Sequence, residues 1–239
     1  MIPFKIRCSA IGEIMTEPRK KGDALSKTAE SYLDRWIKEQ VYGRKYQFTS
    51  KYTDKGIIME DNAIDFIAEM LGFGFLIKNE TFFENEYLRG TPDILPKGHD
   101  LVIDVKNSWS WESFPLLETE VPNKDYYCQL QGYMALTGLN HAKLIYVLSD
   151  TPDHLIEREA RRWCYSNGYD ELENEIYERF YGEMTYPDVK RELRIKVFDI
   201  ERNDEAITSI YEKVMNCRDY INERIKNIPT WKLQEPSKN

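Results

Sequence analysis

The segment LRGTPDILPKGHDLVIDVKNSW, residues 88–109, carries the clearest structural signal in this chain. Its LVIDVK portion, residues 101–106, is a short apolar run of the kind that forms a buried strand. Side chains alternate along a strand, so Asp104 and Lys106 are predicted to share one face. Two charged groups on an apolar strand are costly to bury unless something neutralises them. A bound cation would supply that neutralisation, and the alternative is a surface ion pair.

The whole chain has 239 residues, of which 41% are hydrophobic and 31% charged. This is the composition of an ordinary globular protein, and the length allows a substantial core. The sequence contains no internal repeat, low-complexity tract or Gly/Ser-rich linker, so one domain over residues 1–239 is predicted. No apolar run approaches a membrane span, and the N-terminus lacks the apolar region of a signal peptide. We therefore expect a cytoplasmic location and no membrane partner.

Cysteine and histidine are used sparsely. The four cysteines are scattered singly and are predicted to be reduced thiols: Cys8, Cys128, Cys164 and Cys217. None has the close spacing of a zinc or iron–sulfur site. The three histidines include no pair at metal-binding spacing. The sequence therefore predicts neither zinc nor an iron–sulfur cluster.

The net charge of −8 argues against a protein that coats nucleic acid without specificity. It does not exclude a nucleic-acid enzyme, because metal-binding acids themselves add negative charge. A local basic track would be enough to hold a phosphate backbone, although for any single member we favour a solvated surface charge. The candidates for this track are Lys5, Arg7, Arg19, Lys20, Lys21, Lys51 and Lys55.

The hydrophobic pattern predicts helices and strands that alternate along the chain. Helices are expected after Ser9, which could cap the first of them, and over 24–43, 55–72, 123–137, 152–182 (two or so) and 201–226. Strands are expected within 74–85, 87–95, 100–106, 141–149 and 191–200. This order indicates an α/β or α+β fold with a central mixed sheet flanked by helices. The C-terminal helix could cover a subunit interface or close the core, and we favour the core.

Glu60 lies in a predicted helix, three residues after Ile57 and four before Ile64. This spacing places it on the apolar stripe formed by Ile57, Ile64, Ile67 and Leu71. A carboxylate on a core-facing stripe is expensive to bury alone, so Glu60 is a candidate functional acid. The alternative is a glutamate at the edge of the stripe that reaches water.

Asp93 closes the predicted strand YLRGTPDIL. Gly90 permits close backbone approach, and Pro92 cannot donate to a strand ladder, so this strand lies at an edge or ends there. The alternative is an aspartate in a turn. Asp153 follows the same Thr-Pro dipeptide, but no Asp-x-Lys strand follows it, so we interpret Asp153 as a helix-start or turn residue.

Gln129 is predicted to share one helix face with Tyr133. A glutamine there could orient a water or a phosphate, or could simply bond to the backbone. The NSWSWESFP segment after the charged strand contains three aromatic residues, Trp109, Trp111 and Phe114. They could stack on bases or wedge a duplex end open, and the alternative is packing on the fold.

Four spacings occur in order along helix, strand, strand and helix: G-x-x-x-E at 56–60, G-x-x-D at 90–93, D-x-K at 104–106 and Q-x-x-x-Y at 129–133. Together they resemble the PD-(D/E)XK nuclease superfamily, in its RecB-type and phage lambda exonuclease-like (YqaJ-type) branch. The N-terminal RCSAIGEIM resembles the segment that contacts the DNA end in that family. Ser9 matches its serine, and Arg7 is the candidate for its arginine. The family often has glutamate at the position of Asp104, and aspartate is an equally good oxygen ligand.

The resemblance implies a restriction-endonuclease-like core and a Mg²⁺-dependent exonuclease that digests linear double-stranded DNA, 5′ to 3′, in phage-type recombination. The implied catalytic residues are Glu60, Asp93, Asp104, Lys106 and Gln129. One Mg²⁺ would be held by Asp93, Asp104 and the Val105 carbonyl, and Glu60 would hold a second ion or its water; Mn²⁺ is expected to substitute. Lys106 would orient the attacking water and favour its deprotonation.

The expected DNA contacts are Ser9, Arg7, Tyr133 and Trp111. The implied partners are double-stranded DNA ends, a single-strand annealing protein and further copies of the chain in a ring-shaped trimer. Three other functions remain open at this point. They are a structure-specific or restriction-type endonuclease, a catalytically silent DNA-end-binding scaffold, and a structural protein whose acids form only surface ion pairs.

Overall fold

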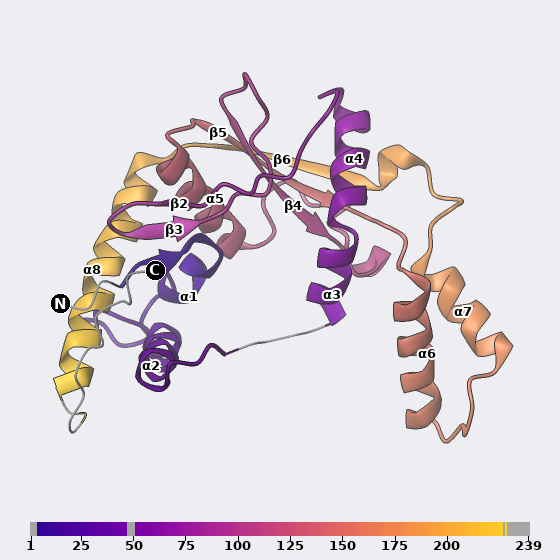
Figure 1. Cartoon of the computed structure of the whole chain (residues 1–239), viewed down its shortest axis with the longest axis horizontal. Helices are drawn as coiled ribbons and strands as arrows, with labels where there is room; N and C mark the ends of the chain where they lie inside the picture. The colour runs from indigo at the N-terminus through magenta and orange to yellow at the C-terminus, as the bar shows by residue number, and fades with distance from the viewer. Residues whose placement is uncertain (1–3, 47–50, 227, 229–239) are drawn as a thin grey trace.

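The computed structural model describes residues 4–46, 51–226 and 228, and its centre is a three-stranded sheet (Figure 1). The strands run in the order β4 (Leu101–Asn107), β5 (His141–Val147) and β6 (Ile195–Glu201). The first two are parallel and in register along their whole length, and the third is antiparallel to β5. Parallel neighbours need a crossover, which α5 (Lys124–Thr137) provides.

A second, smaller sheet brings the N-terminus beside the segment before β4. Its order is β1 (Ile6–Arg7), β3 (Leu88–Gly90) and β2 (Phe83–Glu84). The predicted α/β class is therefore confirmed, but the single central sheet is divided into two. Ile94 connects the sheets, because it exchanges both backbone hydrogen bonds with Ile103 at 3.0 and 3.1 Å and also forms a bridge with Lys78.

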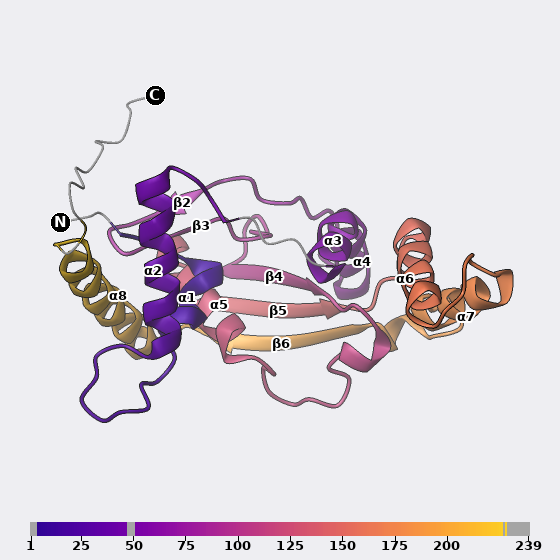
Figure 2. The ribbon, with the colours of Figure 1, turned by 90° about the horizontal axis from the view of Figure 1, so that it is seen from below.

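Helices cover both faces of the central sheet (Figures 1 and 2). On one side lie α1 (Ile11–Ile14), after a 3₁₀ turn at Cys8–Ala10, then α2 (Lys27–Tyr42), α5 and α8 (Asp204–Lys226). They enclose the larger core. On the other side, α4 (Glu60–Leu71), which follows α3 (Lys51–Ile58), encloses a second core against β4 and β5. The predicted packing of α8 on the core is observed, because Ile210, Val214 and Ile221 are buried there.

Helix ends follow the local sequence in most places. Gly43 and Gly72 end α2 and α4 with φ of 60° and 70°, the left-handed conformation that glycine adopts at low cost. The Ser26 side chain caps α2 by accepting the Ala29 N–H at 3.0 Å. The predicted Ser9 cap is wrong, because α1 begins at Ile11, its N-cap residue is Ala10, and no side chain caps it.

The helix predicted over 55–72 is interrupted at Met59, which ends α3 and precedes α4. As a result the proposed apolar stripe is not continuous. Ile64 and Ile67 are buried, but Ile57 is 73% exposed. The argument that placed Glu60 on that stripe is therefore incorrect.

Two helices, α6 (Asp153–Ser166) and α7 (Asn174–Met184), form a hairpin that projects from the body (Figure 1). They enclose a small core of their own around Ala160, Cys164 and Ile176. Asp153 is the first residue of α6, as its sequence context predicted. All four cysteines are free thiols, and within the described ranges no helix combines the length and apolarity of a membrane span.

Candidate active site

The site is built around the edge of β4 that faces away from β5. Ile103 uses its N–H and C=O to pair with Ile94 on that edge. Val105, two residues further along the strand, donates its N–H to Asp93 Oδ2 at 2.8 Å. The chain before β4 is thereby fixed so that the Asp93 carboxylate lies against the strand that carries Asp104.

Asp104 and Lys106 lie on one face of β4, as the alternation predicts. Lys106 Nζ lies 2.7 Å from Asp104 Oδ2. Asp104 is 1% exposed, whereas the Lys106 side chain is 23% exposed and lies over the Tyr126 ring at 4.5 Å. The pair is therefore buried at its acidic end and reaches solvent at its basic end.

Gln129 supports this pair from α5. Its side-chain nitrogen donates to Asp104 Oδ1 at 2.8 Å and to the Tyr133 hydroxyl at 3.2 Å. Gln129 is thus bonded to the site itself, not to the backbone. Tyr133 is only 4% exposed, so in this structure its hydroxyl orients Gln129 and presents no surface to DNA.

The charges of these groups affect one another strongly. Burial, followed by the nearby Asp104 carboxylate, raises the pKa of Asp93 to about 7, and Glu60 adds to this effect. Burial alone would lower the pKa of Lys106, but Asp104 and Asp93 outweigh it, so the net shift is upward. The Lys106 ammonium therefore stays protonated at neutral pH, while the two aspartates repel each other.

Glu60 is the first residue of α4, and its charge contributes to the raised pKa of Asp93. It is engaged by Lys78, whose Nζ lies 2.6 Å from Glu60 Oε2. Lys78 was not found from the sequence. Its segment pairs with the chain beside Asp93, through the bridge to Ile94, and that long-range pairing has no local signature.

The donor atoms suit one hard divalent cation. Asp104 Oδ2 accepts no well-formed hydrogen bond from the described residues and has only the Lys106 ion pair. The Val105 N–H points to Asp93, and a strand residue directs its N–H and C=O to the same edge, so the Val105 carbonyl faces this site too. Two carboxylates and one carbonyl, completed by water, fit the preferences of Mg²⁺. Across residues 4–46 and 51–226, no three acid, histidine or cysteine side chains form a metal cluster.

Arginines gather near the N-terminal segment. Arg7 on β1 and Arg89 on β3 are register partners in a parallel pair, so they share a face. Burial raises the pKa of Tyr32, and the charges of Arg7, Arg35 and Arg89 oppose that rise. Arg89 Nε is buried without a hydrogen-bond partner. Arg7 and Ser9 themselves are exposed.

The aromatic segment after β4 is divided between core and surface. Phe114 is 7% exposed, whereas Trp111 is 60% exposed. The Trp111 backbone N–H is fixed by the Tyr186 hydroxyl at 3.2 Å. The prediction that Lys55 belongs to a surface basic track is wrong. Lys55 is fully buried, and its ammonium donates to the Trp109 carbonyl at 3.0 Å. The side chain of Lys51 lies outside the described residues.

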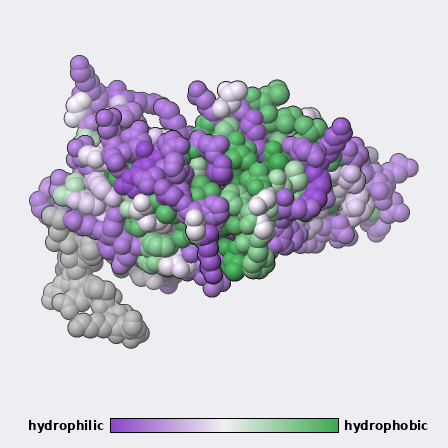
Figure 3. All heavy atoms as spheres, turned by 90° about the horizontal axis from the view of Figure 1, so that it is seen from above, coloured by the Kyte–Doolittle hydropathy of each residue, from purple (hydrophilic) through white to green (hydrophobic). Residues whose placement is uncertain are grey.

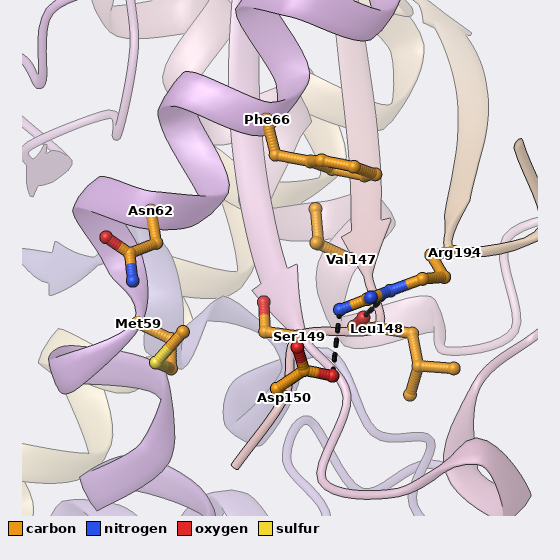
Figure 4. A pocket seen from close by; sticks show the side chains of 8 residues that line it. All are labelled: Met59, Asn62, Phe66, Val147, Leu148, Ser149, Asp150 and Arg194. Carbon is orange, nitrogen blue, oxygen red and sulfur yellow. Dashed lines mark hydrogen bonds and ion pairs between the residues drawn. The ribbon is translucent and has the colours of Figure 1, made fainter. Parts of the chain in front are cut away.

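A cavity of about 190 Å³ lies between the α3–α4 junction and the end of β5 (Figure 4). Met59 and Phe66 line one side, and Arg194, bonded to Asp150, lines another. None of the candidate acids lines it. The cavity is therefore a separate feature from the carboxylate site.

Comparison with known proteins places this geometry among nucleases. No protein-family model matches the chain, and no curated protein does. The solved structure of a phage-related exonuclease from Haemophilus somnus 129PT is 30% identical, with a TM-score of 0.78, over 94% of this chain and 96% of that one. An alkaline exonuclease from Laribacter hongkongensis (LHK-Exo) is 16% identical, with a TM-score of 0.64, over 93% and 90%. That enzyme has also been solved with dAMP.

The fold is that of the PD-(D/E)XK nuclease superfamily. Asp93, Asp104, Lys106 and Gln129 lie together at one edge of its central sheet. Within that superfamily, the full-length similarity at 30% identity is to a phage-related exonuclease. The chain belongs to the lambda exonuclease-like family of the superfamily.

Proposed function

We propose that this protein is a Mg²⁺-dependent exonuclease that digests linear double-stranded DNA from its 5′ ends during phage-type recombination. The observation that carries the proposal is the convergence of Asp93, Asp104, Lys106 and Gln129 at one edge of β4. The Haemophilus somnus exonuclease, similar over almost its whole length, supports it.

The residues have distinct roles in this proposal. Asp93, Asp104 and the Val105 carbonyl hold the cation, which neutralises phosphate charge and favours deprotonation of water. Gln129 holds Asp104 in place. The Lys106 ammonium, exposed at its tip, orients the attacking water and stabilises charge that develops on the phosphate. Glu60 completes the site as the ligand of a second ion or its water.

DNA ends are held, in this proposal, by the N-terminal segment and the exposed aromatic loop. Arg7 and Ser9 are exposed beside β3, and Arg89 extends the positive charge of that surface. Guanidinium groups are well suited to bidentate contact with phosphate. Trp111 is placed to stack on a base after the catalytic strand.

The partners are proposed in the same way. Exposed hydrophobic side chains are numerous in residues 71–82, including Phe75 at 82% and Ile77 at 60%. Figure 3 shows hydrophobic side chains gathered on one face of the molecule. Such surface is typical of protein contacts and supports a homo-oligomer such as a trimer. A single-strand annealing protein is the second partner that we propose.

The decisive experiment is digestion of matched linear and closed-circular duplex of one sequence, each with Mg²⁺ or with EDTA. Lys106→Ala is the inactive control. Loss of the linear DNA alone, only with Mg²⁺ and only with the unmodified chain, is expected. Labelling at the 5′ or the 3′ end then reports polarity.

Other outcomes would favour the competing functions. Cleavage of the circle would indicate an endonuclease. Binding of both DNAs without cleavage would indicate a DNA-end-binding scaffold. Full activity of Lys106→Ala would remove Lys106 from the catalytic set. If the protein neither bound nor cleaved DNA, the structural-protein alternative would be favoured.

A further inference from the structure

Lys78 is the second lysine of the site and contacts the acid that Lys106 does not. Its ammonium forms a 2.6 Å hydrogen-bonded ion pair with Glu60. The Glu60 side chain is 22% exposed and that of Lys78 is 47% exposed. Asp61 and Asp93 also attract this ammonium, so it lies on the acidic side of the site.

The position of Lys78 is set by the backbone and not by the ion pair. Lys78 forms a bridge with Ile94, and the Asn79 N–H donates to the Asp93 carbonyl at 2.7 Å. The Asn79 side chain donates to the Pro92 carbonyl at 3.0 Å. The chain that carries Lys78 is therefore fastened to the chain that carries Asp93, which is itself fastened to β4 through Ile103.

These contacts leave the site with three carboxylates and two internal ammonium groups. Lys106 engages Asp104, and Lys78 engages Glu60. An ammonium 2.6 Å from a carboxylate oxygen competes with a metal ion for that carboxylate, because both cations are attracted to the same negative charge.

We propose that Lys78 is a positioning residue that acts as the internal counter-ion of Glu60. A divalent cation that takes Glu60 as a ligand must compete with the Lys78 ammonium for its negative charge, so Lys78 weakens cation binding in the free protein. The Lys78 side chain is half exposed, so its ammonium could then pair with a DNA phosphate. This inference rests on the proposed function, because that function assigns Glu60 to the metal.

The test is Mn²⁺ binding measured by electron paramagnetic resonance on the full chain without DNA. Lys78→Gln is expected to bind Mn²⁺ about threefold to tenfold more tightly than the unmodified chain, the range expected for loss of one half-exposed competitor. Lys78→Arg, which keeps the charge, should restore weak binding. In a Glu60→Gln background, Lys78→Gln should have no further effect.

Arg191→Gln is the matched control. Arg191 pairs with Glu69 on the same helix α4, also at 2.6 Å, but nine residues along it from Glu60. The Mn²⁺ affinity of Arg191→Gln should equal that of the unmodified chain. Equal tightening in both variants would reduce the effect to net charge and overturn the inference, as would unchanged or weaker binding in Lys78→Gln. Because DNA is absent, a protein that passes this test but cleaves nothing would refute only the proposed nuclease activity.

Discussion

Lys106 Nζ lies 2.7 Å from Asp104 Oδ2 although the two residues are separated by Val105, whose side chain points to the other face of β4. Asp104 is almost fully buried, and its second oxygen is taken by Gln129. In the metal-free protein, Lys106 is thus the only cation that compensates Asp104 within the described residues. The contact that positions Lys106 for its proposed catalytic role also stabilises the fold.

Lys106→Met is therefore expected to destabilise the metal-free protein. Removal of one partner leaves a buried charge uncompensated, which costs about 3 kcal/mol. Lys106→Met combined with Asp104→Asn should cost less than Lys106→Met alone. Urea unfolding in EDTA measures the four free energies of unfolding: those of the unmodified chain, Lys106→Met, Asp104→Asn and the double variant. Additive effects in this double-mutant cycle would show that the two side chains do not interact.

Gln129 should be intolerant of a negative charge. Gln129→Glu would place a carboxylate against Asp104 Oδ1, where the amide now donates at 2.8 Å. We expect it to destabilise the metal-free protein by about 2–3 kcal/mol, and Tyr133→Phe, which removes one hydrogen bond, by about 1 kcal/mol. Melting temperatures in EDTA should rank unmodified, Tyr133→Phe and Gln129→Glu in descending order. The reverse ranking of the two variants would contradict the geometry.

The contact between the N-terminal segment and α5 depends on Gly132. A Cβ at this position would lie 2.5 Å from Ile11 Cδ1 and 3.0 Å from Cys8 Sγ. Gly132→Ala should destabilise the protein by about 1–3 kcal/mol through overpacking. Gly182→Ala on α7 is the matched control, because no atom lies near its Cβ and alanine favours helix by about 0.5–1 kcal/mol. Urea unfolding should therefore shift in opposite directions.

The sequence predicts best the features that depend on neighbours in the chain. The shared face of Asp104 and Lys106 follows from strand alternation alone, and Gly43 and Gly72 mark helix ends by their backbone freedom. The interruption at Met59 has no such marker, because residues 57–71 contain neither glycine nor proline. Glu60 was selected by an argument that the structure overturns, yet it lies close enough to Asp93 to raise its pKa.

Features that depend on distant segments could not be predicted. Lys78 reaches Glu60 only because its segment pairs with Ile94. Arg89 lies beside Arg7 only because β1, near the N-terminus, pairs with β3, which lies about eighty residues later in the chain. The sequence predicts that Tyr133 shares a helix face with Gln129. It does not predict the burial of Tyr133, which depends on the packing of the N-terminal segment on α5. Lys55 was assigned to the surface because a lone lysine is rarely fully buried.

The buried Lys55 gives the protein a pH dependence on the alkaline side. Burial lowers the pKa of Lys55 from 10.5 to about 8, against the attraction of Asp150 and together with the repulsion of Arg194. Between these two pH values the unfolded chain binds more protons than the folded chain. The contribution of Lys55 to the free energy of unfolding therefore rises as the pH increases from about 8 to 10.5, and this gain is lost as the pH falls back to about 8.

Lys55→Met should remove that dependence. The unmodified chain is expected to gain about 2–3 kcal/mol from this group across that window, and the variant is not. The difference between the two chains isolates Lys55, because all other groups titrate in both. Urea unfolding at about pH 7.5 and about pH 10 measures it. A pH-independent difference would mean that the Lys55 ammonium is not desolvated.

Trp111 is expected to act on DNA and not on the fold. Its side chain is 60% exposed, whereas its backbone N–H is fixed by Tyr186 and the neighbouring Phe114 anchors the loop in the core. Trp111→Ala should therefore leave the melting temperature unchanged. Loss of one stacked base, worth about 1–3 kcal/mol, should slow processive digestion of long linear duplex about tenfold or more while single cleavage events continue. Tyr165→Ala on α6, where the side chain is 71% exposed, is the matched control and should digest DNA at the unmodified rate. Undiminished digestion by Trp111→Ala would show that this aromatic side chain makes no contact with DNA that digestion needs.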